Sequence, residues 1–185
     1  EFDAGPAEKN IKDIIGQVDR MSKWVRELLQ SLRPLNDDPE PVNLVAALHE
    51  SLVAFEQQIA KNQVQVAFRP QNTPMVLSQP VQLTQILNSL LANALEAMDK
   101  GGTLTISLEP VDNRSVSVVL SDTGKGMNEE QRTMAFRPFF TTKQGGLGVG
   151  LVLVKRIMER YGGGVTLDSR EGEGTSVRLA FQRVP

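Results

Sequence analysis

Hydrophobic residues near the start of the chain recur at alternating steps of three and four positions. The run comprises Ile11, Ile14, Val18, Met21, Val25, Leu28 and Leu32. This is the a/d spacing of a coiled coil, and it predicts one long helix that pairs with another helix along its whole length. A single amphipathic helix lying on the following domain is the alternative. Pro34 ends the pattern, and we expect residues 35–41 to form a linker.

Two kinds of pattern alternate along residues 42–185. Helical spacing predicts helices at 44–61, from Pro80 to just before Gly101, and at 151–161. Alternation of apolar and polar positions predicts strands at 64–68, 74–77, 103–108, 115–122, 165–167 and 177–181. Because strands neighbour strands and helices separate the groups, the order favours an α+β fold, in which a mixed sheet carries helices on one face.

Composition narrows the class of protein. The 185 residues include no cysteine, 40% are apolar, and the formal net charge is −2. A disulfide framework and a thiolate metal site are therefore excluded. No apolar run approaches the ~20 residues of a membrane span, and the near-balanced charge gives no reason to expect nucleic-acid binding. We expect a cytoplasmic location without direct membrane contact, and leave open whether the parent protein is anchored in the inner membrane.

Residues 121–151 combine several groups that suit a nucleotide. A half-buried strand carries Asp122 at its end, where a carboxylate can accept a hydrogen bond from the exocyclic amine of adenine. Guanine offers a carbonyl at that place and would be repelled, so the acid favours ATP over GTP. Gly124 and Gly126 remove side chains where a flat base would approach the backbone. Lys143 adds a mobile positive charge.

A glycine-rich segment precedes the last expected helix and contains Gly145, Gly146, Gly148 and Gly150. The free N–H groups and the dipole of a helix N-terminus attract phosphate. A glycine run before a helix is more often a plain loop. The conjunction of the acid, the glycines and the lysine predicts an ATP site.

The helix that begins at Pro80 supplies further polar groups. Ser89 and Asn93 are four positions apart and share a face, with Glu96 one turn beyond Asn93. The amide oxygen of Asn93 suits Mg²⁺, which takes oxygen ligands and completes its shell with phosphates and water. A buried asparagine satisfied by backbone is the alternative and would be favoured if this residue stood alone. Asn88 lies on another face and receives no role.

These residues resemble the sequence boxes of a known family. The matching segments are LLANALEAM around Asn93 (N box), 122–127 (DTGKGM, first glycine box), 136–143 (FRPFFTTK, F box), 146–151 (GLGVGL, second glycine box) and 172–175 (GEGT). Their order and spacing are similar to those of the catalytic ATP-binding domain of sensor histidine kinases, in the GHKL superfamily. The FFTTK form resembles the nitrogen-regulator and dicarboxylate-sensor branch. The resemblance covers roughly residues 41–184.

The resemblance implies a Bergerat-type two-layer α/β sandwich at 42–185, preceded by one long coiled-coil-like helix. That helix, within residues 1–34, would be the second helix of the dimerisation and phosphotransfer hairpin, and would make a homodimer through its Ile11–Leu32 face. The implied ATP-binding residues are Asn93, Glu96, Asp122, Gly124, Gly126, Met127, Thr142, Lys143, Gly146, Leu147, Gly148, Val149, Gly150, Leu151 and Thr175.

Roles follow from the same resemblance. Asp122 would hold the adenine amine, Asn93 would ligate Mg²⁺, and residues 128–145 would form a mobile lid over the phosphates. Ser89 departs from the asparagine that is frequent in these kinases, and its shorter reach either weakens Mg²⁺ binding or routes it through water. Gln79 replaces the usual acid in the turn before the N box, a change that we expect to be peripheral.

The implied activity is transfer of the ATP γ-phosphate to a histidine, followed by relay to an aspartate of a response-regulator receiver domain. His49, the only histidine, follows the linker and lacks the basic residue and proline of the family's phosphoacceptor box. We expect His49 to be a surface or core-edge helix residue, and the phosphoacceptor to lie outside these residues. No catalytic residue is therefore assigned. A GHKL ATPase clamp is disfavoured because Ser89 stands where such enzymes have a glutamate base. A degenerate module that binds only nucleotide or a partner is the other alternative.

Overall fold

The computed structural model describes residues 10–11, 14–18, 21–22, 25, 29, 38–111, 114–143 and 145–184. From residue 38 onward the elements are β1 (Glu40–Asn43), α2 (Leu44–Ala54), α3 (Glu56–Lys61), β2 (Val64–Phe68), β3 (Met75–Ser78), α4 (Pro80–Ala97), β4 (Gly102–Pro110), β5 (Ser115–Asp122), α5 (Glu129–Met134), α6 (Gly150–Arg160), β6 (Gly164–Arg170) and β7 (Gly174–Gln182).

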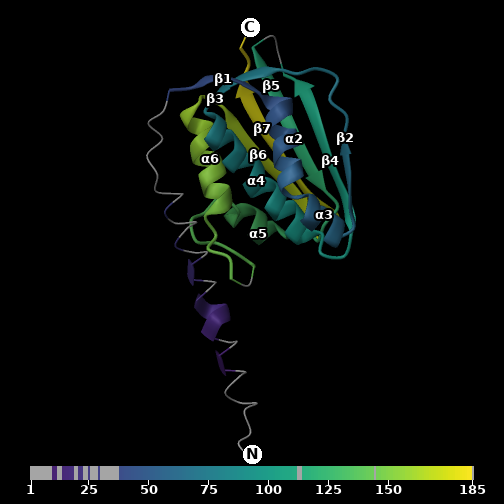
Figure 1. Ribbon diagram of the computed structural model, residues 1–185, viewed down its shortest axis with the longest axis vertical. Helices are drawn as coiled ribbons and strands as arrows, with labels where there is room; N and C mark the ends of the chain where they lie inside the picture. The colour runs from purple at the N-terminus through teal and green to yellow at the C-terminus, as the bar shows by residue number, and fades with distance from the viewer. Residues whose placement is uncertain are drawn as a thin grey trace, which may run out of the picture.

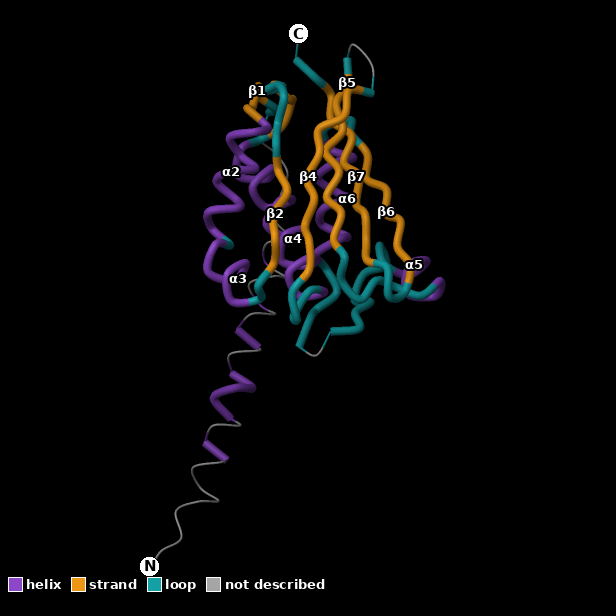
Figure 2. Tube along the Cα trace, turned by 90° about the vertical axis from the view of Figure 1, so that its right-hand side faces the viewer, coloured by secondary structure: helices purple, strands orange, loops and turns teal. Residues whose placement is uncertain are grey.

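The elements from β1 to β7 form two main layers, beside which β1 and β3 make a separate two-stranded sheet (Figure 1). One is a five-stranded sheet in the order β2-β4-β5-β7-β6, in which β2 runs parallel to β4 and the other neighbouring pairs are antiparallel. The other layer consists of helices, and Figure 2 shows α2, α3 and α4 on one side of the strands. The expected α+β sandwich, a mixed sheet with helices on one face, is confirmed.

Helix α4 is the centre of the helical layer, between α2 and α6. Its apolar residues Leu83, Leu87, Leu91 and Leu95 are fully buried, against Leu104, Val118 and Leu179 of the sheet and Ile157 of α6. The helix begins where the sequence predicts, because Pro80 occupies its first turn and the side chain of Gln79 accepts the N–H of Val81 at 2.9 Å. Gln79 therefore caps the helix that carries the N box.

Two expected elements differ from the structure. The helix expected at 44–61 is interrupted at Phe55, which separates α2 from α3 and packs against the core together with Ile59. The linker expected at 35–41 overlaps strand β1, in which Pro41 pairs with Leu77 of β3; residues 35–37 lie outside the described residues. The hydrophobic periodicity of the sequence predicts neither the break at Phe55 nor the pairing of β1 with β3, because both depend on contacts with distant residues.

Strand β5 is buried on both faces, whereas its alternating pattern predicts one wet face. Ser117 and Val119, on the face away from the helices, are 0% and 8% exposed. The salt bridge between Arg178 Nη1 of β7 and Glu109 Oε2 of β4, 2.6 Å long, spans β5 on that face. Charged side chains from the two flanking strands thus cover small residues of the central one, an effect that the pattern of β5 alone does not reveal.

The described residues of the N-terminal run are helical. Five members of the a/d run, Ile11, Ile14, Val18, Met21 and Val25, have exposed fractions between 54% and 60%. Leu28 and Leu32 lie outside the described residues. The described apolar side chains of this run are thus uncovered in the single chain.

Helices α4 and α6 are antiparallel neighbours, and α4 contacts α6 near both ends of α6. Near the start of α4, Gln82 Oε1 accepts the hydroxyl of Tyr161, which follows α6, at 2.6 Å. Seven residues further along α4, Ser89 lies beside Gly150, the first residue of α6, where an added Cβ would come within 2.9 Å of the Ser89 Oγ. The Gln82–Tyr161 bond thus fixes the end of the helix pair that is remote from the glycine box.

We expect Tyr161→Phe to lower the free energy of unfolding by about 1–2 kcal/mol, because it leaves the Oε1 of the buried Gln82 without that donor. Chemical denaturation measures the loss. As a control, Gln82→Met combined with Tyr161→Phe removes both polar partners and should recover part of the stability. A single variant as stable as the wild type would contradict the inference.

Candidate functional site

Asp122, the last residue of β5, has its carboxylate fixed by two backbone groups. Its Oδ1 accepts the N–H of Gly124 at 2.9 Å and the N–H of Thr175 at 3.3 Å. Thr175 is the partner of Asp122 in the pairing of β5 with β7, so the two side chains point to the same face of the sheet. Among the described residues, no hydrogen bond engages Oδ2, which is therefore available to a donor from a ligand.

The environment of this carboxylate makes it a ready acceptor. Burial raises the pKa of Asp122 above its ordinary value, while the N–H groups of Gly124 and Thr175 act in the opposite sense. A partly desolvated carboxylate gains more from a further hydrogen-bond donor than a solvated one does. The charge distribution therefore favours a ligand that presents an amine at Oδ2.

Two glycines near Asp122 are required by close backbone contacts. Gly126 has φ +64°, and a Cβ there would lie 1.8 Å from the carbonyl oxygen of Arg170. Gly174 has φ +108°, and its Cβ would lie 1.9 Å from the carbonyl oxygen of Asp122. The sequence suggests that Gly126 makes room for a base. The structure adds a packing reason, because the first glycine box lies directly against the turn between β6 and β7.

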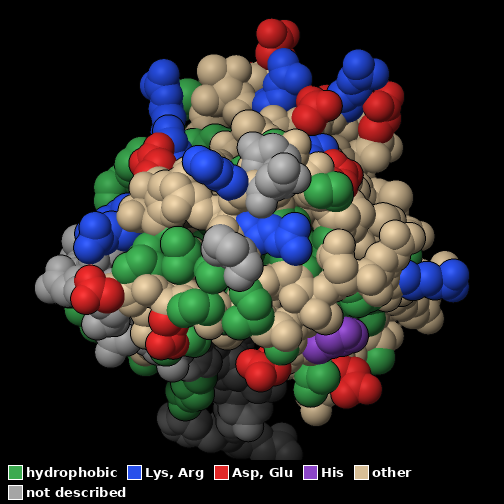
Figure 3. Space-filling view, turned by 90° about the horizontal axis from the view of Figure 1, so that it is seen from above, with side chains coloured by type: hydrophobic (Ala, Val, Ile, Leu, Met, Phe, Trp, Pro, Cys, Tyr) green, Lys and Arg blue, Asp and Glu red, His purple; other side chains and the backbone are tan. Residues whose placement is uncertain are grey.

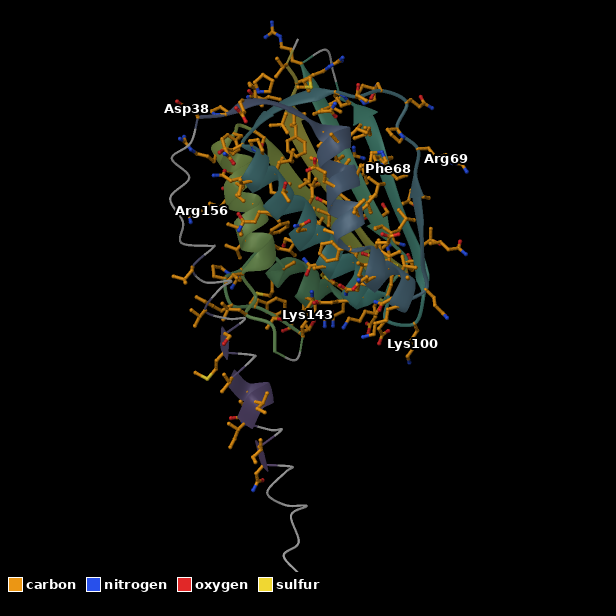
Figure 4. The ribbon with its side chains drawn as sticks, in the orientation of Figure 1. Asp38, Phe68, Arg69, Lys100, Lys143 and Arg156 are labelled. Carbon is orange, nitrogen blue, oxygen red and sulfur yellow. The ribbon has the colours of Figure 1, made fainter. Side chains whose placement is uncertain are left out.

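Asn93 and Glu96 of α4 both contact the lysine of the F box. The Lys143 Nζ lies 2.5 Å from Asn93 Oδ1 and 2.6 Å from Glu96 Oε2. Figure 4 shows Lys143 at the lower end of the domain, beneath α4. The side chains of Lys143 and Glu96 are 36% and 40% exposed, so solvent screens part of this attraction. Asn93 Oδ1 and Glu96 Oε2 nevertheless form a site that attracts a cation.

The N-terminus of α6 lies next to this cluster. Val149 precedes the helix and gives it no side-chain cap, so the first N–H groups have no partner from that residue. Gly150 adjoins Ser89, as noted above. Gly148 has φ +70°, a Cβ there would lie 2.4 Å from the carbonyl oxygen of Phe140, and its own carbonyl accepts the N–H of Phe139 at 3.1 Å. The second glycine box is thus held against the F box, with an open helix N-terminus behind it.

The segment expected to be a lid, 128–145, contains local structure. Helix α5 starts with a capping box between Asn128 and Gln131. Phe139 has φ +64° and is 67% exposed. Residue 144 lies outside the described residues. Met127, Gly146, Leu147 and Leu151, which are expected site residues that flank this segment, are half-buried, and Thr142 within it is exposed. The structure brings the boxes to one end of the domain.

Ser169 of β6 is a polar residue near the site that the sequence analysis did not identify. It is 6% exposed, is the pairing partner of Thr175, and its Oγ lies 2.9 Å from the Thr175 Oγ1. Its hydroxyl also donates to the carbonyl oxygen of Gly174 at 2.8 Å. Only the register between β6 and β7 makes these contacts visible, because Ser169 stands outside the GEGT motif.

His49 does not join this group. It is exposed on α2, and its ring centroid lies 5.1 Å from that of Phe68. Figure 4 shows Phe68 in the upper half of the domain, away from Lys143. The end of the molecule opposite the boxes carries interspersed acidic and basic side chains (Figure 3). The expectation that His49 is a surface or core-edge residue agrees with these contacts.

The described residues have two further properties, which concern metals and membranes. Within that part of the chain, no group of three or more histidine, aspartate and glutamate side chains could hold a metal. Mg²⁺ itself is usually held by one or two protein oxygens together with phosphates and water. No helix there is long and apolar enough to cross a membrane.

Comparison of the sequence with known proteins identifies a matching family and similar relatives. A family model described as "Histidine kinase-, DNA gyrase B-, and HSP90-like ATPase" matches residues 78–185. Sensor histidine kinase ZraS of Salmonella typhi is 33% identical over 159 residues, which are 85% of this chain and 34% of the relative. The chain thus spans about a third of the length of that relative.

Solved structures show the same likeness. The nucleotide-free catalytic domain of histidine kinase ThkA is 29% identical, with a TM-score of 0.72 over 80% of this chain and 100% of that chain. ThkA in its complex with the response regulator TrrA is 27% identical, with a TM-score of 0.79 over 100% of this chain and 54% of that chain. Since the family model covers more than half of the residues, the chain belongs to the histidine kinase-, DNA gyrase B- and HSP90-like ATPase family, with the fold of a histidine kinase catalytic domain.

Proposed function

We propose that this chain is the ATP-binding catalytic part of a two-component sensor histidine kinase. It binds Mg·ATP and presents the γ-phosphate to a histidine on a dimerisation helix, from which the phosphoryl group passes to an aspartate of a response regulator. The observation that carries the proposal is the Asp122 carboxylate, which is fixed through Oδ1 to Gly124 and Thr175 and presents Oδ2 to a donor.

Different residues contact the base and the phosphates of the nucleotide. The adenine amine donates to Asp122 Oδ2, on the face of the sheet that also carries Thr175. The phosphates lie over the glycines at 146–150 and accept hydrogen bonds from the uncapped N–H groups of α6. Lys143 leaves Asn93 and Glu96 and contacts the phosphates when the nucleotide is present. The lid thereby changes its partners from α4 to the ligand.

The residues present fit a magnesium ion. The Asn93 Oδ1 and the Glu96 Oε2 already attract the ammonium group of Lys143, and oxygen ligands of this kind suit Mg²⁺. Asn93 would hold the ion, with Ser89 contributing through water. Bound there, the ion would neutralise charge on the phosphates. Lys143 is the internal cation that this site keeps when no nucleotide is bound.

Phosphoryl transfer is better supported than hydrolysis. Ser89 adjoins the start of α6, and a serine hydroxyl cannot serve as a general base toward water at neutral pH without a partner that takes its proton. A binding module without catalysis is the remaining alternative. The close likeness to kinase catalytic domains supports the kinase, and the labelling experiment below separates the two.

We also infer that the N-terminal helical run makes a homodimer. The five described members of its a/d run are more than half exposed, and an apolar seam of that spacing is buried when two such helices pair. The likeness to ThkA in its complex with a response regulator supports a receiver domain as the second partner. Such a relay would take place in the cytoplasm, where ATP is available.

The function is tested by nucleotide binding and by transfer. ATP should bind the wild-type chain, and Asp122→Asn should lower the affinity roughly ten- to hundredfold, because a hydrogen bond to a charged acceptor is lost while the shape is kept. Calorimetry measures both affinities. Unchanged affinity in the variant would sink the assignment of Asp122.

In the transfer experiment, the chain alone with labelled ATP should remain unlabelled on His49. In-line transfer requires the acceptor within about 3–3.5 Å of the γ-phosphate, and His49 lies away from the site. Mixed with a longer chain that carries the phosphoacceptor helix and Asp122→Asn, the chain should label that longer chain in trans. Acid-labile phosphate on His49, or no labelling of the longer chain, would contradict the proposal.

The pKa of Asp122 predicts a pH-dependent stability. Because the pKa is raised in the folded protein, the stability that its proton contributes is fully present below the unfolded pKa and is lost as pH rises through the folded pKa. Asn at this position does not titrate. Without nucleotide, the unfolding free energy of Asp122→Asn relative to the wild type should therefore increase as pH rises from about 3 to about 7. Urea denaturation across that range measures it, and a constant difference would contradict the shift.

Lys143 should stabilise the lid segment without nucleotide and should strengthen ATP binding. Lys143→Met keeps the length of the side chain but removes the cation, so amide exchange of residues 128–143 should become faster without nucleotide, and ATP affinity should fall about tenfold. The matched control is Lys155→Met, which removes a lysine of α6 whose partner Glu159 is exposed, 3.8 Å away. Equal exchange and affinity in the two variants would rule out a special role for Lys143.

A further inference from the structure

Three side chains line up across neighbouring strands at the floor of the proposed adenine site. Asp122 of β5 pairs with Thr175 of β7, and Thr175 pairs with Ser169 of β6. Directly paired residues of antiparallel strands point to the same face of a sheet. Leu104, which pairs with Asp122 on the other side, is fully buried beneath the helices. The row therefore lies on the helix-covered face.

The hydrogen bonds of this row fix the direction of the Thr175 hydroxyl. Ser169 has a single hydroxyl proton, and it is donated to the carbonyl oxygen of Gly174 at 2.8 Å, an atom that can only accept. The contact of 2.9 Å between the Ser169 Oγ and the Thr175 Oγ1 must then use the proton of Thr175. With its proton committed to Ser169, Thr175 offers only lone pairs to any other neighbour.

We propose that Ser169 is a positioning residue that determines base specificity: it holds Thr175 as an acceptor, so that the floor beside Asp122 accepts hydrogen bonds but does not donate them. The ionised carboxylate of Asp122 is likewise an acceptor, and its Oδ1 already takes two N–H groups. A base edge that reaches this floor therefore meets acceptors from two side chains. This inference rests on the proposed function, since it assumes that a purine occupies the site.

The consequence is discrimination by the group at the six-position of the purine. The amine of adenine is a donor and satisfies such a floor. The carbonyl of hypoxanthine or guanine is an acceptor and leaves an acceptor oxygen that faces the six-position unpaired, which is the kind of mismatch that gives large specificity ratios. Without Ser169, the Thr175 hydroxyl is free to rotate and donate to that carbonyl. Ser169 thus acts on the base through Thr175, without touching it.

The test compares ATP with inosine triphosphate, which differs by a carbonyl in place of the six-amino group and by the proton on the adjacent ring nitrogen. Ser169→Ala should reduce the ratio of ATP affinity to inosine triphosphate affinity about tenfold, the factor expected for one hydrogen bond. Most of the change should come from tighter binding of inosine triphosphate. Calorimetry with Mg²⁺ measures both affinities, and thermal melting verifies that the variant is folded.

The chain offers a matched control on the opposite face of the same strands. Ser121 of β5 and Ser176 of β7, each one position from the row, pair with each other and have their hydroxyl oxygens 2.9 Å apart. Ser176→Ala removes the equivalent hydroxyl contact away from the site and should leave the affinity ratio unchanged. Ser169→Thr, which keeps the hydroxyl, should restore the wild-type ratio.

A double-mutant cycle separates the proposed effect from a structural one. Thr175→Val removes the acceptor and should itself lower the ratio. In that background, Ser169→Ala should produce no further change, because Ser169 acts only through the Thr175 hydroxyl. If Ser169→Ala does not fold, the ratio in Thr175→Val, with Thr175→Ser as the variant that keeps the hydroxyl, decides whether Thr175 is the acceptor.

The outcomes distinguish two failures. A wild-type chain that does not bind ATP overturns the proposed function. A wild-type chain that prefers ATP, with an unchanged ratio in Ser169→Ala, overturns this inference alone. A parallel loss of affinity for both nucleotides in Ser169→Ala also overturns it, because a purely structural role would weaken the two equally.

Discussion

The bond from the Thr175 N–H to Asp122 Oδ1, together with that from Gly124, is the constraint on which the site depends. Through these two hydrogen bonds, one carboxylate oxygen at the end of β5 holds both the start of β7 and the first glycine box. The other oxygen is left for a ligand. Gly126 and Gly174 make this possible, because any side chain there would overlap the backbone of Arg170 or Asp122. The acid and the glycines therefore form one structural unit.

The second half of the site depends on the antiparallel pairing of α4 with α6. That pairing brings Ser89, in the middle of α4, next to Gly150 at the start of α6. Asn93 and Glu96 lie further along α4 and contact Lys143. One end of the helix pair thus carries the uncapped N-terminus of α6 and the side-chain oxygens of Asn93 and Glu96, which the lysine of the F box contacts from the segment before α6. The groups proposed to bind a Mg–nucleotide complex thus include two oxygens and a lysine that contact one another in the structure.

The proposed function assigns the base and the phosphates to parts of the domain that are held with different firmness. The groups proposed to bind the base are fixed by strand register in a sheet whose central strand β5 is buried on both faces. The lysine proposed to contact the phosphates lies on a segment that contacts α4 through this half-exposed side chain, which is a weaker attachment. Under the proposal, a firmly held base and a releasable lysine would allow the γ-phosphate to be offered to a separate acceptor.

The amino-acid sequence by itself determined the fold class, the order of most elements, and the residues of the boxes, because helical and alternating periodicity and glycine placement are local signals. It also predicted that Asp122, Asn93 and Lys143 belong together, through their resemblance to a family. It could not predict the break at Phe55, strand β1, or the burial of Ser117, since each depends on contacts with residues far along the chain. The pairing of Lys143 with Glu96, the backbone contacts that require Gly126 and Gly174, and the hydroxyl pair of Ser169 and Thr175 were decided by the tertiary structure alone. Their partners are brought together by strand register and helix packing, and no spacing along the sequence records the distance between two side chains on different strands.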